Sequence, residues 1–362
     1  MGRAAGWAIA WAAALFVTGA SAQQPRTGQV DRTLVPYANP KDAARLPDGR
    51  SLHVVCMGHG SPTVLLTAGA GDWSLTWSKV QPEVAKTTRA CAWDRPGFGF
   101  SSPPPEPQTV DQTTSDLQAA LRARGIAGPY VLVGHSLGGY ESLLFADRER
   151  PRVAGMVLVD PSFPDQETSL SHAAPQHAQY MLSLRNPLAD QIRKCSASLK
   201  AGALRQGGPD PDNCLHPQWP PSYPPELTTA LTKITAEASP AQIQAAWDTL
   251  VFFTSPYLLA KDSKLVVNPR RDYGAMPLIV LTRTEFRPPL DFPVAARAEI
   301  PAEEAAWNAG HDAIAALSSR GVNARVPGTP HFIHAVKPQV VIDAIEQVVR
   351  EARQGEGKRD AR

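Results

Sequence analysis

One short motif constrains this chain more than any other part of its sequence. An apolar run at residues 130–133 leads directly into the letters GHSLG at residues 134–138, and an amphipathic segment follows to about residue 150. A Gly-x-Ser-x-Gly string between a strand and a helix is typical of a nucleophile elbow, a strained turn that exposes the serine hydroxyl. Side chains at the two glycine positions would collide in such a turn. The N-terminal amides of the helix that follows point toward the negative charge that develops in the transition state. This context predicts Ser136 as a catalytic nucleophile; the alternative is an ordinary glycine-rich turn.

The chain around this motif alternates between apolar strands and amphipathic helices. Strands are predicted at residues 52–57, 63–67, 88–93, 130–133, 153–159, 277–282 and 322–326. Helices are predicted at residues 80–86, 110–124, 302–319 and 338–353. Near-continuous apolar strands that alternate with helices indicate a parallel sheet covered on both faces, so the fold class is α/β.

The alternation stops between residues 163 and 268, where Pro, Ser, Ala and Gln become frequent. Helices are predicted there at residues 176–184, 188–199 and 240–253. We expect this segment to be a helical cap inserted into a core formed by residues 23–162 and 269–353, with a disordered tail at residues 354–362. The aromatic residues of the cap are expected to line an apolar acyl pocket above Ser136 or, alternatively, to form only the cap's own core: Tyr180, Trp219, Trp247, Phe252 and Phe253.

The first 22 residues have the pattern of a secretory signal peptide. Arg3 supplies a positive charge, residues 4–17 are apolar, and residues 20–22 (ASA) form a small-residue cleavage site. The apolar run is short for a permanent membrane span, so we expect cleavage after Ala22 and export to the periplasm or beyond; an uncleaved anchor is the alternative. The polar stretch at residues 23–47 is expected to be a loose lead-in.

The charge balance argues against nucleic-acid binding. The chain has 36 Lys and Arg against 34 Asp and Glu, a formal net charge of +2, and no block of like charge. Such a chain has no basic surplus that would attract a phosphate backbone. The expected partner is therefore a small-molecule substrate.

The four cysteines also lack the spacing of a zinc site.

Three strings of residues make the chain resemble the α/β-hydrolases, in particular the secreted or periplasmic bacterial serine hydrolases. They are GPYVLVGHSLGG at residues 128–139, VLVDP at residues 157–161 and DRPGFGFS at residues 94–101. The resemblance covers about residues 52–164 and 276–349 and leaves the cap uncovered. It implies an eight-stranded, mostly parallel sheet, no cofactor, and hydrolysis of an ester or a related acyl bond.

The resemblance also implies positions for the base and the acid of a triad. The base belongs in the loop between the last strand and the last helix, where His331 is preferred to His334. Asp160 ends the strand after the nucleophile helix, where a subset of the fold carries its acid. It is preferred to Glu285, which follows the strand where most members place an aspartate. An ordinary turn role is the alternative for Asp160.

The same family implies an oxyanion hole made of two backbone N–H groups. These are expected from Leu137 and from Ala70, in the glycine-rich loop after the strand at residues 63–67. In the implied mechanism His331 takes the proton of Ser136 as the hydroxyl attacks an acyl carbon, and water later releases the acyl group. The alternatives are an acyltransferase or a lactonase with the same triad, or a non-catalytic binding protein on this fold.

The four cysteines are expected to form two disulfides. In this fold the strand at residues 52–57 lies beside the strand at residues 88–93, which brings Cys56 close to Cys91. Cys195 and Cys214 lie near each other within the cap. Export to an oxidising compartment favours both bridges, with buried free thiols as the alternative for the first pair.

Overall fold

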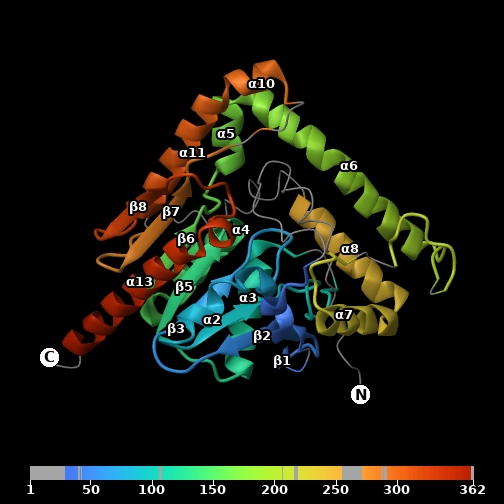
Figure 1. Ribbon diagram of the computed structural model, residues 1–362, viewed down its shortest axis with the longest axis horizontal. Helices are drawn as coiled ribbons and strands as arrows, with labels where there is room; N and C mark the ends of the chain where they lie inside the picture. The colour runs from blue at the N-terminus through green and yellow to red at the C-terminus, as the bar shows by residue number, and fades with distance from the viewer. Residues whose placement is uncertain are drawn as a thin grey trace.

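A twisted sheet with helices on both faces forms the centre of the molecule (Figure 1). The computed structural model describes residues 29–359 except residues 40, 42, 106–107, 206, 216–218, 255–270, 287 and 289–291. The expected signal peptide at residues 1–22 lies outside the described residues. Among the described helices, none combines the length and the apolarity that a bilayer crossing needs.

The sheet has eight strands in the order β1-β2-β4-β3-β5-β6-β7-β8. Their bounds are Ala43–Arg45 (β1), Ser51–Met57 (β2), Thr63–Thr67 (β3), Ala90–Trp93 (β4), Tyr130–His135 (β5), Val153–Val159 (β6), Leu278–Arg283 (β7) and Gly321–Val326 (β8). The pairs β1–β2 and β2–β4 are antiparallel, and all other pairs are parallel. This is the eight-stranded, mostly parallel sheet expected from the sequence. All seven predicted strands are present.

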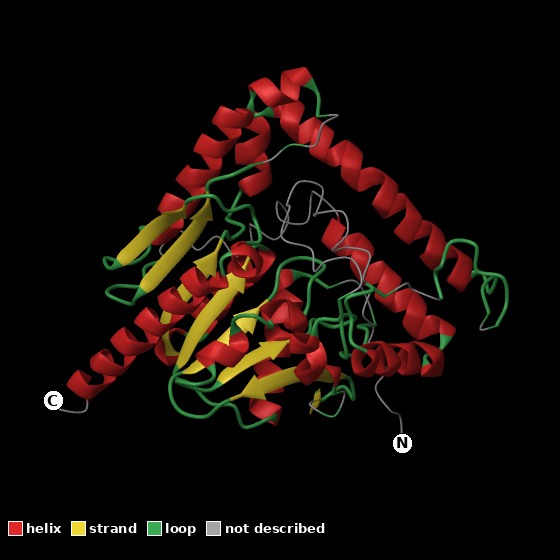
Figure 2. Cartoon of the chain, viewed as in Figure 1, coloured by secondary structure: helices red, strands yellow, loops and turns green. Residues whose placement is uncertain are grey.

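Helices cover both faces of the sheet because its strands are apolar on both sides (Figure 2). On one face lie α3 (Val110–Ala123), α4 (Leu137–Arg148) and α11 (Ile300–Ala315). On the other lie α2 (Gln81–Val84) and α13 (Pro338–Arg359). The remaining short helices of the core are η2 (Ser74–Trp77), η3 (Arg150–Arg152), α10 (Val294–Ala298) and α12 (Ile333–Val336).

The central strand β5 illustrates how the two layers arise. Tyr130 and Leu132 pack in the cluster that contains α3 and α4, whereas Val131 and Val133 pack in the cluster that contains α2 and α13. Side chains of successive strand residues point to opposite faces, so an uninterrupted apolar run must be covered on both. Strand β5 lies in the middle of the sheet, and the GHSLG turn is at its C-terminal end.

The lead-in at residues 23–47 is more ordered than expected. It contains the 3-10 helix η1 (Arg32–Ala38) and strand β1, and Asp31 caps η1 by accepting a hydrogen bond from the N–H of Thr33. The side chains of Leu34 and Tyr37 are buried, and the Tyr37 hydroxyl donates to Oε1 of Gln81 at 2.8 Å. Two buried side chains are enough to fix a short segment that has no clear periodicity of its own.

Among the described residues between β6 and β7 there are four helices: α5 (Gln166–Ala173), α6 (Pro175–Lys200), α7 (Pro225–Glu237) and α8 (Pro240–Thr254). We call them the helical insertion. The sequence predicted α8, missed α5 and α7, and divided α6 into two helices. The helix continues through Pro187, although an interior proline removes one backbone hydrogen bond and crowds the preceding turn, because α6 packs extensively along α8 (Figure 1).

The helical insertion has a core of its own. Ile192 of α6, Leu231 of α7 and Trp247 of α8 belong to one buried cluster. The same cluster includes Phe98 and Phe100, from the turn that follows β4. The insertion is therefore held to the sheet through this turn.

Two disulfides are present, in the pairing that the sequence suggested. Cys56 of β2 is bonded to Cys91 of β4, and these residues face each other across the antiparallel strand pair. Cys195 of α6 is bonded to Cys214 in the loop that follows α6. The first bridge ties two strands together, and the second closes part of the helical insertion.

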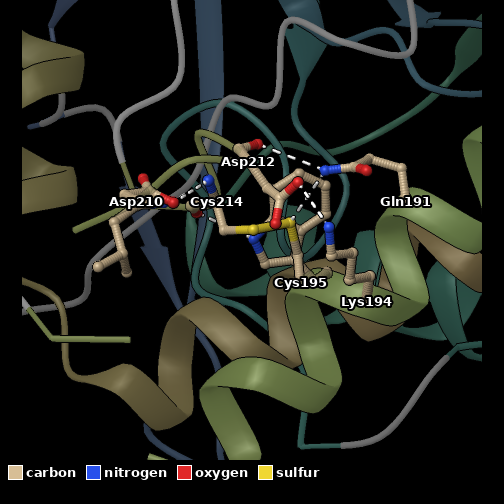
Figure 3. Close-up of a disulfide and its surroundings, with 8 residues drawn as sticks. Gln191, Lys194, Cys195, Asp210, Asp212 and Cys214 are labelled. Carbon is tan, nitrogen blue, oxygen red and sulfur yellow. Dashed lines mark hydrogen bonds and ion pairs between the residues drawn. A yellow bond between two sulfur atoms is a disulfide. The ribbon is translucent and has the colours of Figure 1, made fainter. Parts of the chain in front are cut away.

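The loop around the second disulfide is fixed by two aspartates (Figure 3). Asp210 accepts a hydrogen bond from the N–H of Cys214 at 2.7 Å. The carboxylate of Asp212 lies 2.8 Å from Nζ of Lys194, on α6. The first contact lies within the loop, and the second holds the loop against α6 near the disulfide.

The tail at residues 354–362 was expected to be disordered, but α13 continues to Arg359. The two glycines in this stretch each disfavour an exposed helix by about 1 kcal/mol relative to alanine. They leave the backbone hydrogen bonds intact, and the neighbouring Arg, Glu and Lys residues favour the helix.

Candidate active site

Ser136 occupies a strained turn between β5 and α4. Its backbone has φ 50° and ψ −121°, which is unusual for a residue other than glycine. The N–H of Ser136 donates to the carbonyl of Val159 at 3.1 Å, and its own carbonyl accepts from Gly139 and Ser162, each at 2.9 Å. Strand β6 and the first turn of α4 therefore hold the serine in this conformation.

The glycines around Ser136 are required by close backbone contacts. A Cβ atom on Gly134 would lie 2.2 Å from the carbonyl oxygen of Gly138. A Cβ on Gly138 would lie 2.3 Å from the carbonyl oxygen of Thr67, and one on Gly139 would lie 2.4 Å from Cβ of Pro161. The steric reason proposed for the two glycines of the motif therefore holds in this turn, and it extends to a third glycine.

His331 and Asp160 form a direct contact near this turn. Asp160 follows β6, His331 lies between β8 and α12, and Nδ1 of His331 is 2.6 Å from Oδ2 of Asp160. The aspartate side chain is fully buried, whereas the histidine side chain is 28% exposed. Because a carboxylate only accepts hydrogen bonds, Nδ1 carries a proton and Nε2 is the basic nitrogen of the neutral ring.

Two further donors hold the carboxylate of Asp160. Its Oδ1 accepts from the backbone N–H of Arg283 and from Nε1 of Trp307, both at 3.0 Å. Burial alone would raise the pKa of Asp160, but the hydrogen bond from His331 and the charge of Arg283 hold that pKa well below its usual range. Sequence reasoning missed Arg283 and Trp307, since no motif marks either residue.

The other candidates named from the sequence make different contacts. The backbone N–H of Glu285 donates to the carbonyl of Thr329, and it is Asp160 that contacts His331. His334 is fully buried, with Nε2 3.0 Å from Oγ1 of Thr76. Burial lowers the pKa of His334 to about 3.

His135, next to the serine, supports the loop of His331. Its Nε2 lies 3.1 Å from the carbonyl oxygen of His331, and the two rings are 4.6 Å apart between centroids. A carbonyl accepts, so Nε2 of His135 is the protonated nitrogen. Burial, together with neighbouring positive groups, lowers the pKa of His135 well below its usual value and keeps the ring neutral.

A second histidine buttresses the turn after Asp160. His311 of α11 lies 2.7 Å from Oγ1 of Thr282 through Nδ1, and 2.8 Å from the carbonyl of Pro161 through Nε2. It is fully buried, and burial lowers its pKa. The sequence placed His311 in a helix, as observed, but nothing in the local pattern indicated this contact.

The loop after β3 passes directly beside the serine. A Cβ atom on Gly69 would lie 3.4 Å from Cβ of Ser136. Within the described part of the chain, the N–H groups of Ala70 and Leu137 donate to no protein acceptor. Two unsatisfied amides next to a strained serine are the arrangement that an oxyanion hole needs.

Two carboxyl groups near the site have raised pKa values. Burial raises the pKa of Asp72 to about 6, although a hydrogen bond from Thr76 and the charge of Arg95 act in the opposite direction. Burial likewise raises the pKa of Glu303 to about 7, against the charge of Arg283. Over the described residues, no cluster of three His, Cys, Asp or Glu side chains is placed to hold a metal ion.

The aromatic residues of the helical insertion divide into two groups. Trp247 is buried in the core of the insertion, with Nε1 donating to the carbonyl of Cys214 at 3.1 Å. Trp219 is partly buried, and the Tyr180 ring packs on Phe292. The side chains of Phe252 and Phe253 lie outside the described residues. For Trp247 the structure therefore supports the alternative that it forms the insertion's own core.

A family model described as the alpha/beta hydrolase fold matches residues 62–226 of this chain. Curated relatives match over shorter segments. An uncharacterized protein of Schizosaccharomyces pombe is 43% identical over 128 residues, which are 35% of this chain and 23% of that protein. The lipase LipV of Mycobacterium tuberculosis is 36% identical over 112 residues, which are 31% of this chain and 42% of the lipase. The chain thus spans less than half the length of these two relatives.

Solved structures match over most of the chain. A putative acyltransferase from Salmonella enterica has a TM-score of 0.54 at 16% identity, covering 86% of this chain and 94% of the acyltransferase. An epoxide hydrolase from hot-environment metagenomes has a TM-score of 0.54 at 19% identity, covering 84% of this chain and 97% of the other. At these identities the likeness concerns the fold alone.

Proposed function

Because this chain has the α/β-hydrolase fold, we propose that it is a serine hydrolase that cleaves an ester bond of a small acyl substrate. One observation carries the proposal: Ser136 sits in a strained elbow, and His331, whose ring lies 4.6 Å from that of the adjacent His135, has its Nδ1 2.6 Å from the buried Asp160. The fold alone hosts many reactions, so these residues, rather than the fold, support this particular reaction. The similarity of 112 residues to the lipase LipV adds support, because that relative is named a lipase.

In the proposed reaction the triad passes one proton and forms one covalent intermediate. His331 takes the hydroxyl proton of Ser136 as Oγ attacks the acyl carbon, and Asp160 stabilises the imidazolium cation. The N–H groups of Leu137 and Ala70 stabilise the oxyanion of the tetrahedral intermediate. His331 then protonates the leaving alkoxide. Water, activated by the same histidine, hydrolyses the acyl-enzyme and restores the serine.

We further propose that the enzyme is exported. The first 22 residues have the pattern of a cleavable signal peptide, and two disulfides are present in the folded chain. Disulfides persist in oxidising compartments, which is consistent with a periplasmic or secreted protein. The leader sequence and the two disulfides together support export.

A single expression experiment tests both proposals. The full chain is produced in a bacterium, and a fluorophosphonate probe is applied to the exported fraction. We expect a labelled protein that begins at Gln23 and hydrolyses esters from a panel of graded chain length that also contains lactones and amides. The Ser136→Ala variant should be exported and folded, but it should lose labelling and activity. An active Ser136→Ala variant would remove the serine from the mechanism, and a wild-type protein that is neither labelled nor active would favour a binding function.

A further inference from the structure

A buried ion pair outside the triad reaches the two peptides that precede Ala70. Arg95, in the turn after β4, and Glu141, on α4, are 2% and 3% exposed and are joined by hydrogen bonds from Nε and Nη2 of the arginine. The same guanidinium donates from Nη1 to the carbonyl of Gly69 at 2.8 Å and from Nη2 to the carbonyl of Ala68 at 2.5 Å. One side chain therefore bridges a helix and a loop.

The contact with Gly69 determines where the Ala70 N–H points. The carbonyl of Gly69 and the N–H of Ala70 belong to the same planar trans peptide, in which oxygen and hydrogen lie on opposite sides. When Nη1 of Arg95 holds the oxygen on one side, the hydrogen must project to the other. The backbone N–H of Asp72 also donates to this oxygen, at 3.3 Å, which adds to the restraint.

The contact with Glu141 ties this loop to the second amide of the oxyanion hole. Glu141 lies four residues after Leu137 in α4, so the two residues are neighbours on one side of the helix. The hydroxyl of Thr113, on α3, donates to Oε1 of Glu141 at 2.5 Å and fixes the carboxylate from a third element. Arg95 thereby links the loop that carries the Ala70 N–H with the helix that carries the Leu137 N–H.

We propose that Arg95 and Glu141 are positioning residues for the oxyanion hole, because they set the direction of the Ala70 N–H relative to the Leu137 N–H. The inference rests on the serine hydrolase function proposed above. A buried ion pair is a poor source of stability, since the cost of removing two charges from water offsets their attraction. The ion pair is explained by its effect on the orientation of the loop, because one guanidinium group can donate to two carbonyls and a carboxylate at once.

The test replaces the pair without leaving a buried charge. In Arg95→Met/Glu141→Met both charges are removed together, so the protein is expected to fold. We expect kcat for an ester to fall by about 100-fold with little change in KM, as for loss of one oxyanion donor. The inhibition constant of a trifluoromethyl ketone, whose adduct with serine carries an oxyanion, should rise in the same proportion. A pair that is merely structural would change the melting temperature and leave both quantities unaffected.

The matched control removes a second ion pair of α4 that does not touch the loop. Arg271 donates from Nε to Asp147 at 2.8 Å, and its side chain is 5% exposed. Arg271→Met/Asp147→Leu should retain kcat and ketone affinity even if its stability changes. Equal losses of kcat in the two double variants would overturn the proposal, as would wild-type kcat and ketone affinity in Arg95→Met/Glu141→Met.

A single variant keeps the test decisive if the double variant does not fold. Arg95→Lys retains a charge opposite Glu141, but one ammonium group lacks the fork that holds both carbonyls. It should lose kcat and ketone affinity together, and full activity in this variant would overturn the proposal. Failure here is distinct from failure of the proposed function: a wild-type protein labelled at Ser136 with a fully active Arg95→Lys variant rejects the positioning role alone.

Discussion

Asp160 can hold an imidazolium cation because its charge is stabilised before His331 is protonated. The carboxylate accepts from His331, from the backbone N–H of Arg283 and from the indole of Trp307. Burial alone would favour the neutral acid, so these donors and the nearby guanidinium are needed to keep it ionised. The same donors leave little freedom for any replacement at residue 160.

We expect Asp160→Asn to lose far more activity than Glu285→Gln. An asparagine would direct an amide N–H or a neutral oxygen toward His331 and would conflict with the donors on its other side, so the imidazole would be held in the wrong tautomer. By comparison with other triads, kcat should fall by about 10⁴-fold, with Glu285→Gln close to wild type. Steady-state kinetics on one ester, with circular dichroism as a check of folding, measure this difference. Equal activity of Asp160→Asn and the wild type would move the acid role to another carboxylate.

The residues of the site differ in how far the sequence could predict them. Ser136 follows from a local motif, because the turn that exposes it needs its glycines within four positions. The pairing of Asp160 with a loop histidine depended on a family resemblance and left Glu285 open. Arg283 and Trp307 come from β7 and α11, and Arg95 reaches back to the loop after β3. Contacts between such distant segments have no local pattern that a single sequence displays.

The strands of the sheet were predictable because buried strands are continuous apolar runs, a signal that the helices of the insertion lack. Buried strands such as β3 and β6 are continuous apolar runs, and their bounds agree with the prediction. In the insertion, α5 is largely exposed, and the buried stripe of α7, formed by Leu227, Leu231 and Ile234, follows a run of prolines that obscures the start of the helix. α5 packs against α6 and α11, and α7 packs against η1 and shares a buried cluster with α6 and α8, so the positions of both helices depend on tertiary packing.

The burial of Trp247 leads to a prediction about the insertion as a unit. Trp247→Ala should destabilise the protein by about 3–5 kcal/mol, the usual cost of removing a buried tryptophan. The ratio of activities on short and long esters should remain unchanged, because the indole packs within the insertion. Trp219→Ala is the matched control, and it should cost less because that side chain is only partly buried. A changed chain-length preference with little loss in urea unfolding would place Trp247 in the acyl pocket after all.

At the scale of the whole molecule, the described part of the chain contains six histidines and carboxyls whose pKa values are shifted in the direction that burial favours. Burial lowers the pKa of four histidines, in order along the chain His135, His177, His311 and His334. Burial raises the pKa of two carboxyls, those of Asp72 and Glu303. When the pH falls, the histidines and the carboxyls change the free energy of unfolding in opposite directions. Their balance therefore decides how the stability of the fold responds to acid.

The histidines outnumber the carboxyls, so stability should decrease as the pH falls from about 6.5 toward 5. A histidine whose pKa is lowered by folding takes up a proton in the unfolded chain before it does so in the folded protein. The free energy of unfolding therefore decreases as the pH falls below the usual histidine pKa of 6.5. A carboxyl with a raised pKa is protonated first in the folded protein, which has the opposite effect. His334→Gln should reduce the slope of unfolding free energy against pH by up to about 1.4 kcal/mol per pH unit, the effect of one proton. Urea unfolding at several pH values measures it, with the exposed His172→Gln as the control. Identical slopes for the wild type and His334→Gln would mean that His334 is protonated equally in the folded and unfolded chains.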